Sequence, residues 1–363
     1  RDVAPSRGLG DVYKRQENAD QKFYRIAADF AYSRTVPSLV SYPGLSTFSS
    51  SLERSTMDHF AFMGDLGVNA ATQYSNGTPL TDALYGVRYF MSAKDFDPKE
   101  IEANPDKMYF YRFTDRFDLH RYFTDKVYED KRYVVYKNPN SFPLAYGTNS
   151  LVRNIQFGAN NAFANQNIIL NSMEGHQKAN NDTVEYFKPL AFSSIETENV
   201  IEEKVNKETG EAIYKRADSS KDAIIRYKVT PRTNYTYYFF TPVSLIQNQD
   251  YSVLLNNKWL LNAKIFTQRQ IWQLTDQTEN QETVIEFRFR TDHIDMSNAG
   301  VYRADVDQIQ QVLENRKKQG LHVTKFSNTH IVGDVSITDD SNYMMTSIPY
   351  SCLLYTSPSP RDG

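Results

Sequence analysis

Two short stretches of the sequence place carboxylates near a histidine, the residue types that bind metals or act as acid and base. In the first stretch, three arginines alternate with the acidic residues, and the spacing matches no established set of metal ligands. We therefore expect a solvated face of ion pairs there. The residues concerned are Asp115, Asp118, His120 and Asp125, with Arg112, Arg116 and Arg121 between and beside them.

The second stretch contains Asp292, His293 and Asp295, which we expect in a loop after a strand. Asp side chains and backbone oxygens hold calcium in many sandwich proteins that bind sugars. One histidine and two aspartates are too few to indicate such a site. We assign no metal to either stretch, and we expect no cofactor.

Three aromatic residues, Trp259, Trp272 and Tyr237, are candidates for contact with a glycan. Their flat rings could pack against the C–H groups of a sugar. The alternative is packing in the core, which we favour because the chain holds 22 Phe and 25 Tyr and aromatic packing must be common in it.

No established catalytic motif is present in the sequence. It contains no phosphate-cradling glycine loop, no G-x-S-x-G and no H-E-x-x-H. The 44 acidic residues do not single out a pair of carboxylates suited to glycoside hydrolysis. We therefore assign no catalytic residue.

The two ends of the chain resemble translated sequencing adapter, read on opposite strands at Ser6–Gln16 and at Cys352–Gly363. We expect residues 1–16 and 352–363 to be artefacts, and residues 17–351 to be a fragment truncated at both ends. Since Cys352 is the only cysteine, the remaining segment has no thiol. Removing the head, with a net charge of +2, changes the formal charge from −3 to −5. A nucleic-acid binder would usually be basic, so we expect no nucleic-acid partner.

The 363 residues, 40% hydrophobic and 23% charged, are enough for about two globular domains. No stretch approaches the roughly 18–20 apolar residues that cross a bilayer. In the second half, strict alternation in Thr283–Arg290 predicts a strand with one buried face. Similar runs at Ala223–Val229 and Asn234–Phe240, and a hairpin at Ser252–Leu261 that turns at Asn256-Asn257, predict an antiparallel β-sandwich.

We expect an α+β protein with a mixed α/β subdomain at residues 17–175 and an antiparallel, jelly-roll-like β-sandwich at residues 176–351. Helical spacing of apolar residues predicts helices at 51–66 and 161–173 in the first part. The clearest helix lies near 304–320, where Asp305 or Asp307 can cap the start and Gly320 the end.

Several short motifs, taken in order, resemble the large extracytoplasmic region of the YfhO family of bacterial multi-pass membrane proteins. The resemblance covers nearly all of residues 17–351. Its polar motif residues, Arg25 and Asp82, are expected to be structural. The motifs are Phe23-Tyr24-Arg25-Ile26, Asp82–Tyr89, Asn138-Pro139, Phe142–Tyr146, Asn165-Gln166-Asn167 and the closing Ser347-Ile348-Pro349-Tyr350-Ser351.

The resemblance implies a part of a GT-C-like glycosyltransferase on the extracytoplasmic face of the bacterial cell membrane. It implies transfer from a lipid-linked sugar donor to a cell-envelope polymer such as teichoic acid. The missing transmembrane region of the same chain would hold the catalytic residues, so none is carried over to this sequence. The alternative is a secreted carbohydrate-binding β-sandwich module, and a further one is a structural cell-surface domain without a ligand.

Overall fold

The computed structural model describes most of the chain between Tyr24 and Ser347. The described residues are 24–30, 43–50, 52–68, 70–74, 77–94, 116–123, 125–130, 133–158, 161–232, 235–241, 250–262, 271–275, 281–327, 330–338 and 341–347. Among them, no helix is long and apolar enough to cross a membrane.

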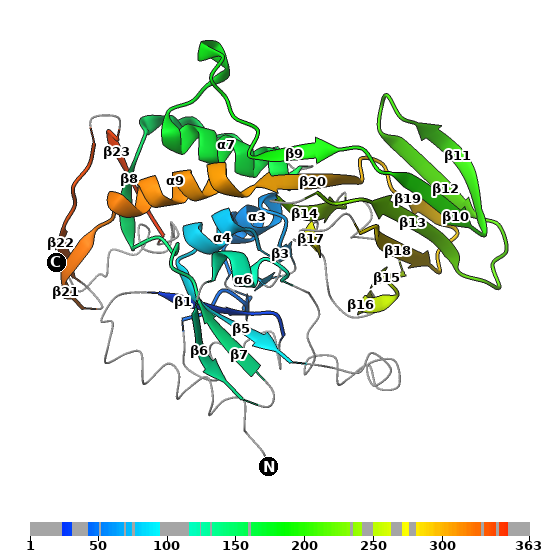
Figure 1. The fold of residues 1–363 in the computed structure, drawn as a ribbon, viewed down its shortest axis with the longest axis horizontal. Coiled ribbons are helices and arrows are strands. Elements are labelled where there is room, and N and C mark those ends of the chain that lie inside the picture. The colour runs from blue at the N-terminus through cyan, green and yellow to red at the C-terminus, as the bar shows by residue number, and fades with distance from the viewer. Residues whose placement is uncertain are drawn as a thin grey trace.

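Most of the structure is antiparallel β-sheet, with helices gathered in one layer (Figure 1). The helices are α3 (Arg54–Phe62), α4 (Pro79–Leu84), α6 (Leu119–Tyr122), α7 (Ala162–Glu174) and α9 (Val306–Lys318), with short 3-10 turns at Ser150–Asn154 and Lys178–Asn180. The predicted helices at 51–66, 161–173 and 304–320 correspond to α3, α7 and α9.

The largest sheet has the order β10-β13-β18-β15-β16, and a second has the order β17-β14-β20-β9. The strands of the first are β10 (Ser194–Glu198), β13 (Ala223–Val229), β18 (Thr283–Phe289), β15 (Tyr251–Leu255) and β16 (Lys258–Asn262). Those of the second are β17 (Ile271–Thr275), β14 (Tyr235–Phe240), β20 (Gly300–Asp305) and β9 (Phe187–Leu190).

These two sheets pack face to face and confirm the predicted β-sandwich. Ile285, Phe287 and Phe289 of β18 point into the shared core, as the alternation predicts. Opposite them, Phe239 of β14 approaches Phe287 with ring centroids 5.3 Å apart. The β15–β16 hairpin turns at Asn256 and Asn257, which both have the positive φ angles that a tight two-residue turn requires.

The sheet that contains β14 is covered on both faces. Tyr237 and Phe239 belong to the sandwich core, whereas Tyr238 and Phe240 belong to a second core with Phe163 of α7. The rings of Phe163 and Tyr238 lie 5.4 Å apart. This explains why β14 is an almost unbroken aromatic run. The second core therefore draws residues from both sides of the predicted boundary at residue 175.

Smaller sheets complete the fold. A four-stranded sheet lies below the helices in Figure 1, and β1 in it pairs parallel with β5. Strand β23 returns to the first part of the chain and pairs with β8. The four-stranded sheet contains β1 (Arg25–Ala28), β5 (Val87–Ala93), β7 (Tyr133–Lys137) and β6 (Asp125–Glu129). Two three-stranded sheets contain β11 (Val200–Asn206), β12 (Glu211–Arg216) and β19 (His293–Asp295), and β2 (Thr47–Phe48), β4 (Ala71–Gln73) and β3 (Leu66–Val68). Two strand pairs contain β21 (His322–Phe326) with β22 (Ile331–Asp334), and β23 (Tyr343–Thr346) with β8 (Ala145–Thr148).

A buried ion-pair cluster joins these parts. Arg116 lies 2.5 Å from the carboxylate of Asp82 and 2.8 Å from that of Asp118, and all three side chains are essentially inaccessible to solvent. The Tyr74 hydroxyl donates a 2.6 Å hydrogen bond to Asp82. The backbone N–H of Asp118 donates to Gln273 of β17 at 3.3 Å. The expectation of a solvated ion-pair face is therefore wrong for Arg116 and Asp118, because the helices and β17 enclose them.

We expect the Arg116→Met variant to lose about 3–5 kcal/mol of unfolding free energy, because it leaves two buried carboxylates without their cation. Guanidinium denaturation followed by circular dichroism would measure this loss. The matched control is Arg54→Met, which removes an exposed pair with Asp58 and should cost under about 1 kcal/mol. Equal stability of the two variants would contradict the structural role of the cluster.

Candidate functional site

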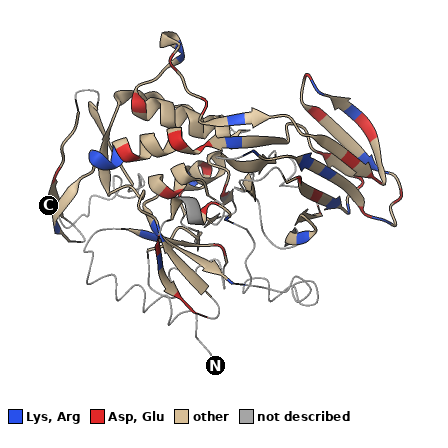
Figure 2. Cartoon of the chain, viewed as in Figure 1, with Lys and Arg blue, Asp and Glu red and all other residues tan. Residues whose placement is uncertain are grey.

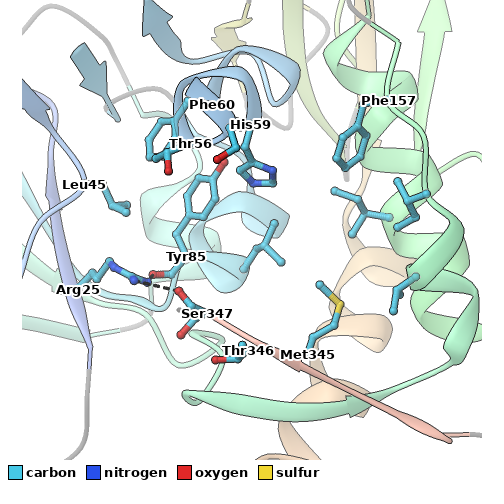
Figure 3. A pocket seen from close by; sticks show the side chains of 15 residues that line it. Arg25, Leu45, Thr56, His59, Phe60, Tyr85, Phe157, Met345, Thr346 and Ser347 are labelled. Carbon is cyan, nitrogen blue, oxygen red and sulfur yellow. Dashed lines mark hydrogen bonds between the residues drawn. The ribbon is translucent and has the colours of Figure 1, made fainter. Parts of the chain in front are cut away.

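An apolar cleft of about 440 Å³ lies beside α3, α7 and β23 (Figure 3). This volume is in the range of sites that hold small organic ligands. Ser55, Thr56 and Thr346 also line it. The larger apolar side chains that line it include Leu45, Phe60, Leu84, Ile155, Phe157 and Met345.

The turn after α4 forms one wall of the cleft. Helix α4 begins at the Thr78 capping box with Pro79 in its first turn, and it ends at Tyr85. Gly86 then adopts a φ of +64°, a conformation that glycine accepts without strain, and the chain enters β5. The Tyr85 ring stacks on Phe60 of α3 with centroids 5.1 Å apart and an interplanar angle of 9°.

Arg25 supplies a cation at one end of the cleft. Its guanidinium donates hydrogen bonds to the backbone carbonyls of Tyr85 at 2.7 Å and Ser347 at 2.9 Å. Burial lowers the pKa of Arg25 to about 10, which leaves it charged at neutral pH. Arg25 therefore joins the first strand, the end of α4 and the segment after β23, which is the structural role expected from the sequence.

His59 lies opposite Arg25 in the cleft wall, with its ring edge-on to Tyr85 at 5.6 Å and to Phe157 at 6.1 Å (Figure 3). Burial among these rings lowers the pKa of His59 to about 4, so the imidazole is neutral at physiological pH. Within the described residues, the buried hydroxyl of Tyr85 has no hydrogen-bond partner. The cleft thus combines a hydrocarbon-like wall with a few polar groups and one cation, an arrangement suited to an amphipathic ligand.

The aromatic candidates from the sequence do not line this cleft. Trp272 and Tyr237 are 1% and 2% exposed in the sandwich core. The Trp272 indole donates to Thr241 at 3.4 Å, and the Tyr237 hydroxyl accepts a 2.7 Å hydrogen bond from the backbone N–H of Arg232. Neither ring has a face open to a sugar, because the opposite sheet covers both. Of the three, Trp259 alone is partly exposed, and its role in glycan contact stays a prediction.

Trp259 lies on the outer face of the five-stranded sheet. The strand register places it in one row with Leu254, Glu286, Arg226 and Glu196, and paired residues share a face. A groove of about 480 Å³ crosses this face and is lined mainly by charged and amide side chains. The charges compensate one another, since Arg226 lies 2.5 Å from Glu286 and 3.2 Å from Glu198.

The acidic stretches do not assemble into a metal site within the described residues. Asp118 is paired with Arg116, and Asp125 is exposed on β6. Asp292 pairs with Arg216 at 2.8 Å, while His293 and Asp295 lie in β19. Asp115 and the side chain of His120 lie outside the described residues.

Sequence reasoning did not identify the cleft or His59. The residues that line the cleft come from seven separate stretches of the chain, and apart from Arg25 and His59 they are ordinary apolar or hydroxyl residues. The one available signal was that Arg25, Tyr85 and Ser347 all fall in the recognised motifs. Their meeting in space follows from long-range strand pairing, which the local spacing does not encode.

We expect protonation of His59 to destabilise the protein between about pH 6.5 and pH 4. The unfolded chain takes up a proton at the ordinary histidine pKa of 6.5, whereas the folded chain resists it down to about 4. Over this interval, His59→Phe should gain about 1–2 kcal/mol in unfolding free energy relative to the parent chain. Urea titrations at several pH values would measure the difference, with exposed His330→Phe as the control. A constant difference at all pH values would contradict the burial of a neutral imidazole.

Two solved structures resemble the chain over about a third of its length. A family 35 carbohydrate-binding module from Clostridium thermocellum matches 32% of this chain and 93% of its own, at 13% identity and a TM-score of 0.21. A β-glucosidase from Kluyveromyces marxianus in complex with glucose matches 30% of this chain and 13% of its own, at 14% identity and a TM-score of 0.17. Scores this low carry no conclusion about function.

No curated protein matches the sequence. The family model described as "Bacterial membrane protein YfhO" matches residues 6–352, which is nearly the whole chain. The motifs that suggested the resemblance lie within this range, and in the structure Arg25 joins three of them through its hydrogen bonds to Tyr85 and Ser347. The chain therefore belongs to the YfhO family of bacterial membrane proteins.

Proposed function

We propose that this chain is an extracytoplasmic, non-catalytic portion of a YfhO-like multi-pass membrane glycosyltransferase. Membership of the family over residues 6–352 is the observation that carries the proposal. The portion described here positions a sugar or a glycopolymer, such as a teichoic acid, for transfer from a lipid-linked donor. Transfer itself takes place in a membrane-embedded region of the same protein.

The environment of the buried carboxylates supports a non-catalytic role. A general base must reach the proton that it removes. Asp82 and Asp118 both pair with Arg116, and both side chains are inaccessible to solvent. Burial alone would lower the pKa of Arg116, and the charges of Asp118 and Asp82 outweigh it, so that the pKa lies above its ordinary value. This permanently charged cation holds both carboxylates in a structural role.

The chemistry of the cleft supports contact with a lipid-linked donor. Its apolar wall suits a hydrocarbon segment, and Arg25 at one end suits the phosphate that links the lipid to the sugar. Arg25 is held by two backbone carbonyls, so its position is fixed before a ligand arrives. A fixed cation costs less conformational entropy on binding than a flexible one.

A second candidate function is carbohydrate binding by the outer face of the sandwich, independent of any transferase. The observation that favours it is the partly exposed Trp259 in a row with the polar groove. A partly exposed indole beside amide and carboxylate groups can pack its free area against a sugar ring while the polar groups hydrogen-bond the sugar hydroxyls.

We expect the purified chain to bind farnesyl phosphate, used as a soluble probe for the donor lipid, more tightly than farnesol. Met345→Trp fills the cleft and should lower the affinity at least about tenfold, measured by isothermal titration calorimetry. The matched control is the neighbouring Met344→Trp, because successive residues of β23 point to opposite sides. The contribution of the cleft would be contradicted if the probe did not bind or if both variants behaved alike.

We expect Trp259→Ala to weaken binding of purified wall teichoic acid about tenfold, and Trp259→Phe to retain most of it, since one aromatic face remains. Biolayer interferometry with the immobilised polymer would measure both. If the alanine variant bound as tightly as the parent chain, the outer face would be excluded as the glycan site. Teichoic acid binding that also survives Met345→Trp would place the polymer outside the cleft.

A further inference from the structure

The polar groups of the cleft are concentrated on one helix. Ser55, Thr56 and His59 of α3 line the cleft, whereas the lining residues between positions 152 and 169 are all apolar. The three polar residues share one face of α3, because Ser55 and Thr56 lie four and three positions before His59. We call these three residues the α3 wall.

The imidazole of His59 has no hydrogen-bond partner among the described residues. Burial is the one cause of its lowered pKa, so neither a nearby charge nor a hydrogen bond stabilises one form of the ring. A neutral imidazole carries one N–H donor and one acceptor. Leaving such a group unpaired in a largely apolar cleft costs free energy, so its presence indicates contact with a ligand.

Aromatic rings lie on both sides of this imidazole. The His59 ring is edge-on to Tyr85 at 5.6 Å and to Phe157 at 6.1 Å (Figure 3). Phe157 is partly exposed and lines the cleft. A hydrogen-bonding group beside an accessible aromatic ring suits a sugar, because the sugar hydroxyls take the hydrogen bonds and its C–H groups pack on the ring.

Among the described residues that line the cleft, Arg25 is the one that carries a charge at neutral pH. Arg25 donates to the backbone carbonyl of Tyr85, and the ring of Tyr85 contacts His59. A single residue therefore connects the cation to the α3 wall. A ligand with its phosphate at Arg25 meets uncharged donors and acceptors next to it, which fits a neutral polyol and not a second anion.

We propose that the α3 wall binds the sugar of the lipid-linked donor, and that His59 distinguishes a glycosylated lipid phosphate from a bare one. This inference rests on the proposed function, in which the cleft holds the donor. The phosphate lies at Arg25, and the sugar lies between His59 and Phe157 and hydrogen-bonds the imidazole. The lipid lies along the apolar side chains near Met345.

The test compares the binding of farnesyl phosphate and of its glucosyl ester to the whole chain by isothermal titration calorimetry. We expect the parent chain to bind the glucosyl ester about tenfold more tightly, because the sugar adds hydrogen bonds and ring packing to the same phosphate and lipid contacts. His59→Phe keeps an aromatic ring beside Tyr85 and Phe157 and removes both ring nitrogens. It should bring the two affinities within about twofold of each other, whereas a merely structural role would change both and keep their ratio. The exposed His330→Phe is the matched control and should keep the tenfold preference.

A second variant, Thr56→Val, removes a hydroxyl of the α3 wall with little change in volume and decides the test if His59→Phe does not fold. It should lower the preference about threefold. A preference that folded His59→Phe retains, or that Thr56→Val leaves unchanged, would overturn the inference and leave the proposed function intact. Equal binding of the two ligands by the parent chain would do the same, whereas failure to bind either ligand would overturn both.

The glycerol ester of farnesyl phosphate separates a sugar from the glycerol headgroup of a phospholipid. Both place hydroxyls beside a lipid phosphate, but glycerol has no ring to pack on Phe157. We expect the glycerol ester to bind less tightly than the glucosyl ester. An equal gain in affinity from the glycerol ester would overturn the assignment of the α3 wall to a sugar.

Discussion

The buried cluster of Arg116 with Asp82 and Asp118 is the constraint on which the arrangement of the parts depends. An unpaired charge in this environment would cost several kcal/mol, so the three groups must meet in any folded state. Asp82 belongs to α4, and the backbone N–H of Asp118 donates a hydrogen bond to the side-chain oxygen of Gln273 in β17. Gln273 in turn donates to the carbonyl of Gly77, directly before α4. The cluster therefore fixes the position of the helical layer against the sheet of β17, β14, β20 and β9, which we call the middle sheet. Apolar packing alone would leave this position undetermined.

The middle sheet connects the helical layer to the β-sandwich. Because β14 is buried on both faces, the sandwich core and the core around α7 share one layer and cannot shift independently. Helix α7 adds polar contacts to the same junction, since Gln166 accepts a 2.5 Å hydrogen bond from Thr78 at the start of α4. The cleft lies beside this junction, and its Tyr85 wall is the end of the helix that the cluster positions. The binding surface is thus a consequence of the same contacts that unite the fold.

The sequence predicted elements whose cause is local, and missed features whose cause is not. Alternation alone predicted the buried face of β18. Asn256-Asn257 marked the turn of the β15–β16 hairpin because asparagine tolerates the left-handed conformation. Asp305 or Asp307 was expected to cap α9, and Asp305 is the one that accepts a hydrogen bond from the backbone N–H of Gln308. The burial of Arg116 could not be foreseen, since its partner Asp82 lies 34 residues away and the local pattern of alternating charges is typical of a solvated face. Core packing was favoured for Trp272 and Tyr237, and both are buried. The cleft could not be foreseen, because long-range strand pairing assembles it.

The proposed contacts fall on separate parts of the molecule. On the outer face of the sandwich, Arg226 and Lys228 are each paired with glutamates, so this surface carries little net charge (Figure 2). The cleft, which β23 borders, is lined mostly by apolar side chains and shares no lining residue with the groove on that outer face. Under the proposed function, a donor lipid and a glycopolymer therefore contact different surfaces of the chain, and the binding of one does not block the other.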